Sequence, residues 1–577
     1  MVKRFWAMYG NCKKYAILTP VLVICEVVFD LIVPIFMSKI IDVGINGNGG
    51  VNFILRYGIY MVLLSILSLL FGGASGFAAA KASAGLGKNI RTNIFNKVQD
   101  FSFANIDKFS TASLITRLTS DVMQIRMAFM QGIRMLVRAP IMVILTTILA
   151  MDINADLAIV FFAAIPLLSF SLYFVFKKAH PLFLVMMKKY DVMNSAIQEN
   201  LIGIRVVKTF VRGDYETKKF EAASRDVRDT QAKAEKILAF NTAAFELIMY
   251  ACMIAVAWFG GKFIIAGSMT TGNFMRYMSY VGQILMALMM ISMALVQFVM
   301  AEASVDRIIE VLDEDIDIKD MPTVDNTRVV EEGSLTFENV FFRYSRKSDK
   351  STLENINLTI NPGEIVGIIG GTGSGKTSLV QLIPRLYDVT EGSVKVGGKD
   401  VREYSRRRLR ESIGVVLQKN VLFSGTIMEN LRWGKENASD EEVYEACKAA
   451  QAHDFILSFP AGYDTFLGQG GVNLSGGQKQ RICIARALLK KPKIMILDDS
   501  TSAIDTDTDS RIRKALRTEL SGMTTLIIAQ RIASVSDADK IIVMDDGKIQ
   551  DVGTHTELIK RNEIYQDLYE SQLKGVA

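Results

Sequence analysis

An eight-residue run near the middle of the chain has the composition of a phosphate-binding loop. It follows the pattern G-x-x-x-x-G-K-[ST], in which glycines let backbone N–H groups approach phosphate oxygens closely. We expect Lys376 to reach the β- and γ-phosphates of a nucleotide and the Thr377 hydroxyl to ligate Mg²⁺. The apolar run 365–369 before the loop predicts a buried strand, and the residues after it predict a helix whose positive end faces the phosphates. The predicted nucleotide-binding residues of this segment are Gly370, Gly371, Thr372, Gly373, Ser374, Gly375, Lys376, Thr377 and Ser378.

Further polar motifs follow the loop, most of them at the end of an apolar run. They are Gln418 after 415–417, Leu-Ser-Gly-Gly-Gln at 474–478, Asp498 and Asp499 after 494–497, and Gln530 after 526–529. In kind and order these motifs resemble those of ATP-binding cassette (ABC) proteins. With six apolar spans before them, they make the chain similar to half of an ABC exporter over nearly its whole length.

The resemblance implies a role for each motif. Tyr344 would stack on adenine, Gln418 would contact Mg²⁺ or the attacking water, and Asp498 would hold Mg²⁺ through a water. The serine and backbone amides of the signature, at a predicted helix start, suit a γ-phosphate. In this family the signature faces the nucleotide held by the other subunit, so its function requires a dimer. The residues expected to act on the partner's nucleotide are Ser475, Gly476, Gly477 and Gln478.

Two residues depart from the family's pattern at the hydrolytic site. The family usually has a glutamate where this chain has Asp499 and a histidine where it has Gln530. The missing methylene withdraws the carboxylate by more than about 1 Å, and misplacement on that scale costs about 10²-fold in rate. A glutamine cannot share a proton as an imidazole does. The chain therefore resembles the degenerate-site half of heterodimeric bacterial multidrug-type exporters, whose partner keeps both the glutamate and the histidine; the alternative is a homodimer with a slower base.

Long apolar stretches occupy the first half of the chain, which has 577 residues and is 50% hydrophobic. Each stretch exceeds the about 20 apolar residues that a bilayer crossing needs. We expect an amphipathic surface helix at 1–14, a membrane domain at 15–305, a linker at 306–333 and a nucleotide-binding domain at 334–577. The predicted spans are 15–41, 53–80, 132–151, 156–177, 240–266 and 274–301.

Basic residues are concentrated between the apolar stretches. Lys and Arg are frequent in 81–131 and 178–236, and the short connections 152–156 and 267–273 have none. The positive-inside rule therefore predicts a multi-pass protein of the cytoplasmic (inner) membrane with both termini and the nucleotide-binding domain in the cytoplasm. The net charge of +6 fits basic membrane loops better than nucleic-acid binding, so we expect no nucleic-acid partner. Five cysteines have neither metal-binding nor disulfide spacing.

The two long cytoplasmic connections predict helical hairpins. Helices of about 20–25 residues would reach about 30 Å beyond the membrane, with tips near 104–107 and 212–215. Such hairpins can transmit the movement of a soluble motor to the spans. A cytoplasmic bundle without a mechanical role is the alternative.

Acidic and methionine residues inside the spans are candidates for a substrate pathway. Glu26 and Asp30 lie one helical turn apart in the first span, and acidic groups at that depth usually face a cavity or a partner. They suit cationic or amphipathic substrates; an interhelical polar contact is the alternative. Met286, Met290 and Met293 of the sixth span would suit a broad-specificity lumen, although such residues more often serve ordinary packing.

The predicted fold is an α-helical membrane domain of six long transmembrane helices with cytoplasmic extensions, followed by an α/β P-loop NTPase domain of ABC type. The predicted function is export of small amphipathic or drug-like compounds by alternating access, driven by ATP with Mg²⁺. The expected partners are a second half-transporter, membrane lipid and a hydrophobic small molecule. A lipid flippase, a homodimeric exporter and a nucleotide-gated channel subunit are the alternatives.

Overall fold

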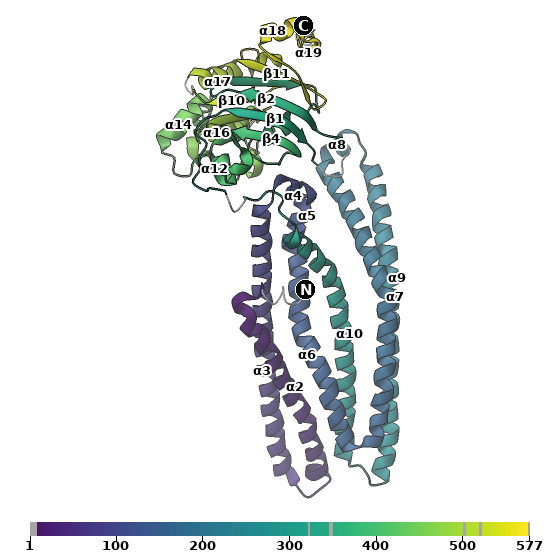
Figure 1. Cartoon of the computed structure of the whole chain (residues 1–577). Coiled ribbons are helices and arrows are strands. Elements are labelled where there is room, and N and C mark those ends of the chain that lie inside the picture. Colours follow the sequence, from purple (N-terminus) through teal and green to yellow (C-terminus); the bar gives the residue numbers. More distant parts are fainter. Residues whose placement is uncertain (1–7, 321–323, 345–349, 500–503, 519–521, 575–577) are drawn as a thin grey trace. The chain divides into compact units, whose positions relative to one another are not determined.

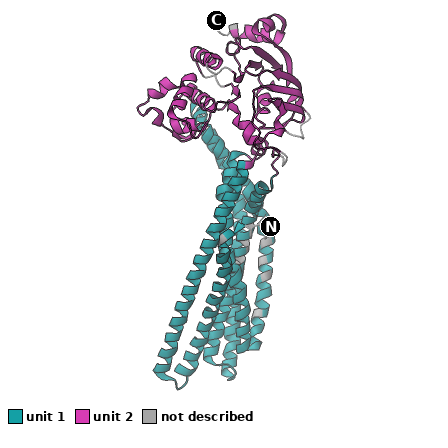
Figure 2. Cartoon of the chain, turned by 60° about the vertical axis from the view of Figure 1, so that its left-hand side comes forward, with its two compact units in different colours: residues 1–99, 110–314 teal, residues 100–109, 315–577 magenta. Residues whose placement is uncertain are grey.

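The computed structural model describes residues 8–320, 324–344, 350–499, 504–518 and 522–574. The chain divides into two compact units, one of residues 1–99 with 110–314 and one of residues 100–109 with 315–577. Figure 2 colours the first unit teal and the second magenta. The first unit is helical and the second contains the sheets, which confirms the predicted fold class.

The first unit consists of long helices that lie side by side (Figure 1). Among the described residues, six helices are long and apolar enough to cross a membrane, as predicted. Prolines occur inside three of them, which membrane helices tolerate because neighbouring groups satisfy the freed backbone atoms. The elements of this unit are η1 (Gly10–Cys12), α2 (Lys13–Lys39), the π-helix η2 (Ile40–Ile45), α3 (Gly50–Asp100), α5 (Thr111–Thr116), the π-helix η3 (Arg117–Asp121), α6 (Val122–Ile153), α7 (Ala155–Ile202), α8 (Ile204–Thr209), α9 (Gly213–Ile265) and α10 (Thr271–Asp313).

Three predicted segments differ from the observed ones. Residues 100–109, predicted to belong to the membrane domain at 15–305, group with the second unit. The linker was expected to begin at residue 306, but α10 continues to Asp313 because its last turns still have an apolar face. Ile308 and Val311, three residues apart on that face, are fully buried. Of the surface helix expected at 1–14, residues 1–7 lie outside the described residues. The rest contains the short 3₁₀ helix η1 and the start of α2 at Lys13.

The second unit is built on three β-sheets among its described residues. A six-stranded sheet has the order β12-β11-β3-β10-β9-β6, a four-stranded sheet the order β2-β1-β4-β5, and β7 pairs with β8. In the larger sheet β11, β3, β10, β9 and β6 are parallel, and only β12 is antiparallel to its neighbour. The strands are β1 (Leu335–Phe342), β2 (Leu353–Ile360), β3 (Ile365–Gly370), β4 (Glu391–Val396), β5 (Lys399–Asp400), β6 (Ile413–Val416), β7 (Gly425–Thr426), β8 (Phe466–Leu467), β9 (Ile494–Asp498), β10 (Thr524–Ile528), β11 (Lys540–Asp545) and β12 (Lys548–Gly553).

Apolar side chains bury the parallel strands on both faces. Ile496 and Ile528 belong to one core, whereas Met495 and Leu497 belong to the other. Alternation of this kind explains why these strands are continuous apolar runs in the sequence. The helices of this unit are α4 (Phe103–Lys108), α11 (Lys376–Gln381), α12 (Arg406–Glu411), α13 (Ile427–Arg432), α14 (Asp440–Ala449), α15 (His453–Leu457), α16 (Gly476–Leu488), α17 (Thr506–Thr518), α18 (His555–Arg561) and α19 (Glu563–Lys574), with the 3₁₀ helices η4 (Val401–Glu403), η5 (Gly462–Asp464), η6 (Gln469–Gly471) and η7 (Ile532–Ser534).

Candidate functional site

Four neighbouring parallel strands bring the predicted hydrolytic residues to one edge of the large sheet. The phosphate loop follows β3, Asp498 ends β9, Gln530 lies two residues beyond β10, and Gln418 lies two residues beyond β6. Because β3, β10, β9 and β6 are adjacent and parallel, their carboxyl ends lie together. In open α/β sheets this edge is where ligands bind.

The path of the phosphate loop requires glycine at two positions. Gly370 has a φ of +156°, and a Cβ there would lie 2.1 Å from the backbone oxygen of Met544. Gly375 has a φ of +93°, and its Cβ would lie 2.8 Å from Cδ2 of Leu353. Both the conformation and the space therefore exclude a side chain. Steric limits therefore explain why both fixed positions of the motif, Gly370 and Gly375, are glycine in this chain.

Lys376 lies across the oxygens of its own loop. Its Nζ donates hydrogen bonds to the carbonyl oxygens of Gly370 and Gly371, at 2.9 and 2.7 Å, and to Ser374 Oγ at 3.2 Å. Burial lowers the pKa of the Lys376 ammonium, while the negative charge of Asp498 raises it. An ammonium whose hydrogen bonds, among the described residues, all go to neutral oxygens is suited to exchange them for the charged oxygens of a phosphate.

Thr377 and Asp498 are joined directly. Thr377 Oγ1 donates a hydrogen bond of 3.0 Å to Asp498 Oδ1, and Asp498 is 3% exposed. Burial raises the pKa of Asp498, whereas the hydrogen bond from Thr377 lowers it. A hydroxyl and a carboxylate side by side are the hard oxygen ligands that Mg²⁺ prefers, so these residues fit a magnesium–nucleotide complex.

Asp499 is held by the two glutamines of the site. Its Oδ2 accepts a hydrogen bond from Gln530 Nε2 at 2.8 Å and a longer one from Gln418 Nε2 at 3.5 Å. Its φ of +48° is left-handed, a conformation that aspartate tolerates better than most residues. Burial raises the pKa of the Asp499 carboxyl, and the hydrogen bonds from both amides lower it. The two departures from the family pattern are thus in contact with each other.

Tyr344 lies beside the helix that follows the phosphate loop. Its hydroxyl is 2.8 Å from Ser378 Oγ, and its ring packs edge-on against Tyr387 with centroids 5.1 Å apart. The residue is 48% exposed, so part of its ring is accessible to a planar ligand. Its role in stacking on adenine stays a prediction.

The signature residues form the start of α16. Ser475 is the N-cap residue, and its Oγ accepts from the backbone N–H of Gln478 at 3.3 Å. Gln478 Oε1 accepts in return from the Ser475 N–H at 2.9 Å, which completes a capping box. Ser475 and Gly476 are exposed at this helix start. These bonds join the signature to itself, whereas Gln418, Asp498, Asp499, Gln530 and the phosphate loop meet at the sheet edge.

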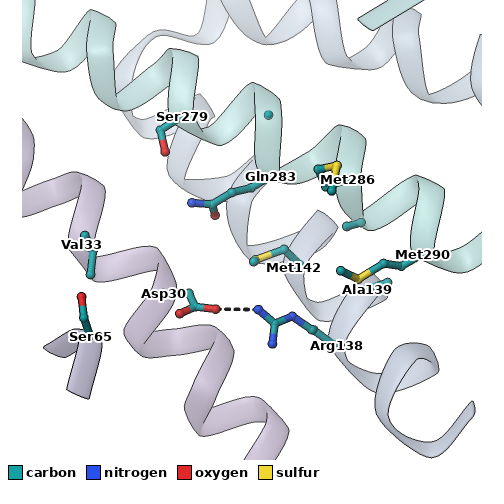
Figure 3. Close-up of a pocket in the computed structure, with 12 residues that line it drawn as sticks. Asp30, Val33, Ser65, Arg138, Ala139, Met142, Ser279, Gln283, Met286 and Met290 are labelled. Carbon is teal, nitrogen blue, oxygen red and sulfur yellow. Dashed lines mark hydrogen bonds and ion pairs between the residues drawn. The ribbon is translucent and has the colours of Figure 1, made fainter. Parts of the chain in front are cut away.

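A cavity of about 470 Å³ lies among the helices of the first unit (Figure 3). Of the predicted pathway residues, Asp30, Met286 and Met290 line it. Glu26, one turn before Asp30, and Met293, which is 54% exposed, lie outside the described lining. The further polar side chains of the lining are Ser65, Arg138, Ser279 and Gln283.

Arg138 bridges the two acidic residues of the first span. Its terminal amino groups donate to Glu26 Oε1 and, at 2.7 Å, to Asp30 Oδ2. Glu26 is buried, and its Oε2 has no hydrogen-bond partner among the described residues. Two carboxylates therefore share one guanidinium, which weakens the preference for cationic substrates that the acidic residues alone suggested. Arg138 was not among the predicted pathway residues, although an arginine inside a predicted span is itself a signal of a buried polar site.

The predicted tip of the first hairpin contains a short helix of the second unit. Tyr387 Oη donates a hydrogen bond of 2.7 Å to Asp107 Oδ2, and its ring lies 6.0 Å from that of Phe103. Phe103 and Ala104 pack against one of the two cores of the second unit. Helix α4 is therefore attached to the unit that holds the nucleotide-site residues.

Comparisons with protein families match both halves of the chain. The ABC transporter transmembrane region matches residues 16–288, and the ABC transporter family matches residues 353–502. The chain is similar over most of its length to a solved structure of a bacterial Atm1-family ABC exporter with ATP bound. That structure has a TM-score of 0.86 and 25% identity, with 97% of this chain and 99% of the other chain covered.

Curated relatives extend over nearly the same length. The ABC transporter ATP-binding protein YfiB of Bacillus subtilis (strain 168) is 39% identical, with 97% of each chain covered. YgaD of the same strain, whose name refers to multidrug export, is 32% identical with 99% of each covered. The ATP-dependent lipid A-core flippase of Syntrophus aciditrophicus (strain SB) is 33% identical, covering 88% of this chain and 84% of its own. The chain belongs to the ABC transporters and is an exporter-type half-transporter, with an N-terminal transmembrane domain and a C-terminal domain that binds ATP and couples its hydrolysis to transport.

Proposed function

We propose that this chain is the weakly hydrolytic half of a heterodimeric exporter of small amphipathic or drug-like compounds. Its partner is a non-identical half-transporter that carries a glutamate and a histidine at the positions of Asp499 and Gln530. The pair lies in the cytoplasmic membrane, with lipid around the spans and both nucleotide-binding domains in the cytoplasm.

The observation that carries this proposal is the hydrogen bond of 2.8 Å from Gln530 to Asp499. A carboxylate that positions an attacking water needs an oxygen directed at that water. Here the side chain is short, and one of its oxygens accepts from both Gln530 and Gln418. The signature of this chain keeps its Ser475–Gln478 capping box, so it is suited to complete the hydrolytic site of the partner.

In the proposed site, Tyr344 stacks on adenine and residues 370–378 with Lys376 hold the phosphates. Thr377 and Gln418 would ligate Mg²⁺, and Asp498 would hold it through a water. The ion, when bound, would supply charge that neutralises the phosphates. Slow hydrolysis keeps ATP bound longer at this site, while the partner's glutamate and histidine act at the other.

Movement of the motor reaches the membrane helices through the hairpins. The contacts of α4 support this step, because Phe103 and Ala104 pack on the unit that contains the phosphate loop. Two ATP molecules close the motor dimer, the hairpins transmit the closure, and hydrolysis at the partner's site resets it. The membrane domain then alternates its access between the two sides.

The cavity of Figure 3 supports an amphipathic substrate. Met142, Met286 and Met290 provide an adaptable apolar wall, and Asp30 and Arg138 provide charged groups of both signs. A ligand with an apolar body and a polar end matches a cavity that has an apolar wall and charged groups. The relative named for multidrug export is in line with such a substrate.

Transport by everted membrane vesicles tests the proposal. The chain is co-expressed with a half-transporter that has the glutamate and the histidine, and uptake of ethidium is followed on addition of ATP and Mg²⁺. We expect ATP-dependent uptake that Lys376→Met in this chain lowers, because the lysine holds phosphate oxygens. The matched control is Lys395→Met, since Lys395 pairs with Glu338 on the surface of the same unit. ATP-independent uptake, or equal uptake by vesicles without the chain, contradicts the proposal.

A lipid flippase is the second candidate, because one relative, 33% identical to this chain, is a lipid A-core flippase. The same vesicles, loaded with a fluorescent phospholipid, distinguish the two. Lipid translocation without ethidium uptake favours the flippase.

A further inference from the structure

Helix α19, the last described helix of the chain, contacts the backbone at Gln530 and at Ile532. In α19, Gln572 Nε2 donates a hydrogen bond of 2.8 Å to the carbonyl oxygen of Gln530. Gln572 Oε1 accepts one of 2.8 Å from the N–H of Ile532. A single side-chain amide therefore satisfies one backbone acceptor and one backbone donor, as a neighbouring strand does.

Packing fixes the helix that carries Gln572. Tyr565 is fully buried, and its hydroxyl lies 2.7 Å from His555 Nδ1 of α18. Ile564 and Leu568 pack against the core of the second unit. The amide of Gln572 is thus presented from a fixed element, and the segment 530–532 is the part that it holds.

Residues 530–532 include Gln530, whose side chain reaches the Asp499 carboxylate. The Gln530 side chain donates to Asp499, while its carbonyl oxygen accepts from Gln572. The amides and carboxylate form one continuous path from α19 to the sheet edge. A change at Gln572 moves the backbone from which the Gln530 side chain extends.

We propose that Gln572 is a positioning residue for the nucleotide site, which holds residues 530–532 so that Gln530 stays at Asp499 beside the γ-phosphate. The inference rests on the proposed nucleotide site and adds a residue to it. Gln572 itself acts through backbone contacts with its neighbours, so its loss changes what depends on Gln530 and leaves the phosphate loop intact.

The rate of nucleotide release from the full-length purified chain tests this role. With Mg²⁺ and the fluorescent analogues mant-ATP and mant-ADP, we expect Gln572→Ala to speed mant-ATP release about tenfold, the effect of one or two lost hydrogen bonds. Release of mant-ADP should not change, because it lacks the γ-phosphate beside Gln530. Gln572→Glu keeps the acceptor for Ile532 and loses the donor to Gln530, so we expect an intermediate rate.

Gln566→Ala is the matched control. Gln566 lies in the same helix, but its Nε2 donates to the carbonyl oxygen of Ile559, outside residues 530–532. Release rates like those of the wild type for Gln566→Ala support the proposal. Equal acceleration of mant-ATP and mant-ADP by Gln572→Ala indicates general loosening and overturns it, as does no acceleration of either.

Hydrogen exchange separates this inference from the proposed function. The Ile532 amide should exchange at least about tenfold faster in Gln572→Ala than in the wild type, since its acceptor is removed. Unchanged exchange overturns the inference, whatever the nucleotide data show. A wild-type chain that binds neither mant-ATP nor mant-ADP contradicts the proposed nucleotide site. Even then, faster exchange of the Ile532 amide in Gln572→Ala supports the conclusion that Gln572 holds residues 530–532.

Discussion

Gln530 donates its side-chain amide to Oδ2 of Asp499 at 2.8 Å, so the two unusual residues of the hydrolytic site form one hydrogen-bonded pair. An aspartate withdraws the carboxylate, and a glutamine supplies a donor that engages it. If only Asp499 or only Gln530 is replaced by the family's residue, the other residue faces a side chain that it does not fit. Restoring a single position to the family's residue should therefore recover less activity than restoring both, because contacting residues are not additive.

The glycines of the phosphate loop provide a prediction within one motif. Gly370→Ala places a methyl group against the Met544 carbonyl at a positive φ, whereas a Cβ added at Gly371 would meet no atom within 4 Å. We expect Gly370→Ala to lower the free energy of unfolding of the second unit by about 3 kcal/mol and Gly371→Ala by no more than about 0.5 kcal/mol. Urea unfolding of the full-length chain in detergent, followed by circular dichroism, measures both. Equal effects would show that the loop follows another path.

The charged cluster in the membrane provides a second prediction. Arg138→Met removes the only guanidinium that contacts Glu26 and Asp30 among the described residues. Leaving the buried Glu26 carboxylate without its guanidinium should cost about 3 kcal/mol of stability, and adding Glu26→Gln to the variant should recover part of it. Thermal unfolding in detergent of the single and double variants gives the comparison. Arg276→Met is the control, because Arg276 contacts Tyr280 and lies outside the cluster. An Arg138→Met chain as stable as the wild type contradicts the assigned pairing.

Coupling between motor and membrane provides a third prediction. Tyr387→Phe removes the hydroxyl that bonds Asp107 of α4 and keeps the ring against Phe103. Transport should fall several-fold while ATPase of the same pair is retained, since a coupling contact is lost and the nucleotide residues are untouched. Tyr404→Phe is the matched control, because the Tyr404 hydroxyl bonds the Val396 carbonyl within the same unit. Loss of ATPase in parallel with transport, or no loss of either, argues against coupling through this contact.

Much of the architecture follows from local sequence patterns. The phosphate loop, the strand at 365–369 before it, and the six apolar helices were predictable because each is encoded by a contiguous motif or periodicity. The meeting of Gln418, Asp498 and Gln530 was predictable from the family resemblance. The sheet order then explains it, since the residues end or follow parallel neighbours.

Contacts between distant segments could not be predicted in the same way. The bond from Gln530 to Asp499 depends on the side-chain geometry at the ends of two strands, which spacing does not specify. The pairing of Arg138 with Asp30 joins residues 108 positions apart, and the hold of Gln572 on Ile532 joins residues 40 apart. Such pairs depend on helix packing and chain topology. The sequence left open whether Asp30 belongs to a substrate pathway or makes an interhelical polar contact; the structure gives it a contact with Arg138 and also places it in the cavity lining.

Steady-state ATPase of the full-length chain tests the central claim most directly. The chain is purified alone and with a co-expressed half-transporter that has the glutamate and the histidine, each with and without Asp499→Glu and Gln530→His combined. We predict that the wild-type chain alone is nearly silent, that the pair is active, and that the double variant raises the activity of the chain alone by about 10²-fold. A wild-type chain that hydrolyses ATP by itself as fast as the pair, and loses that activity in Asp499→Asn, would show that Asp499 is a competent base and would contradict the account.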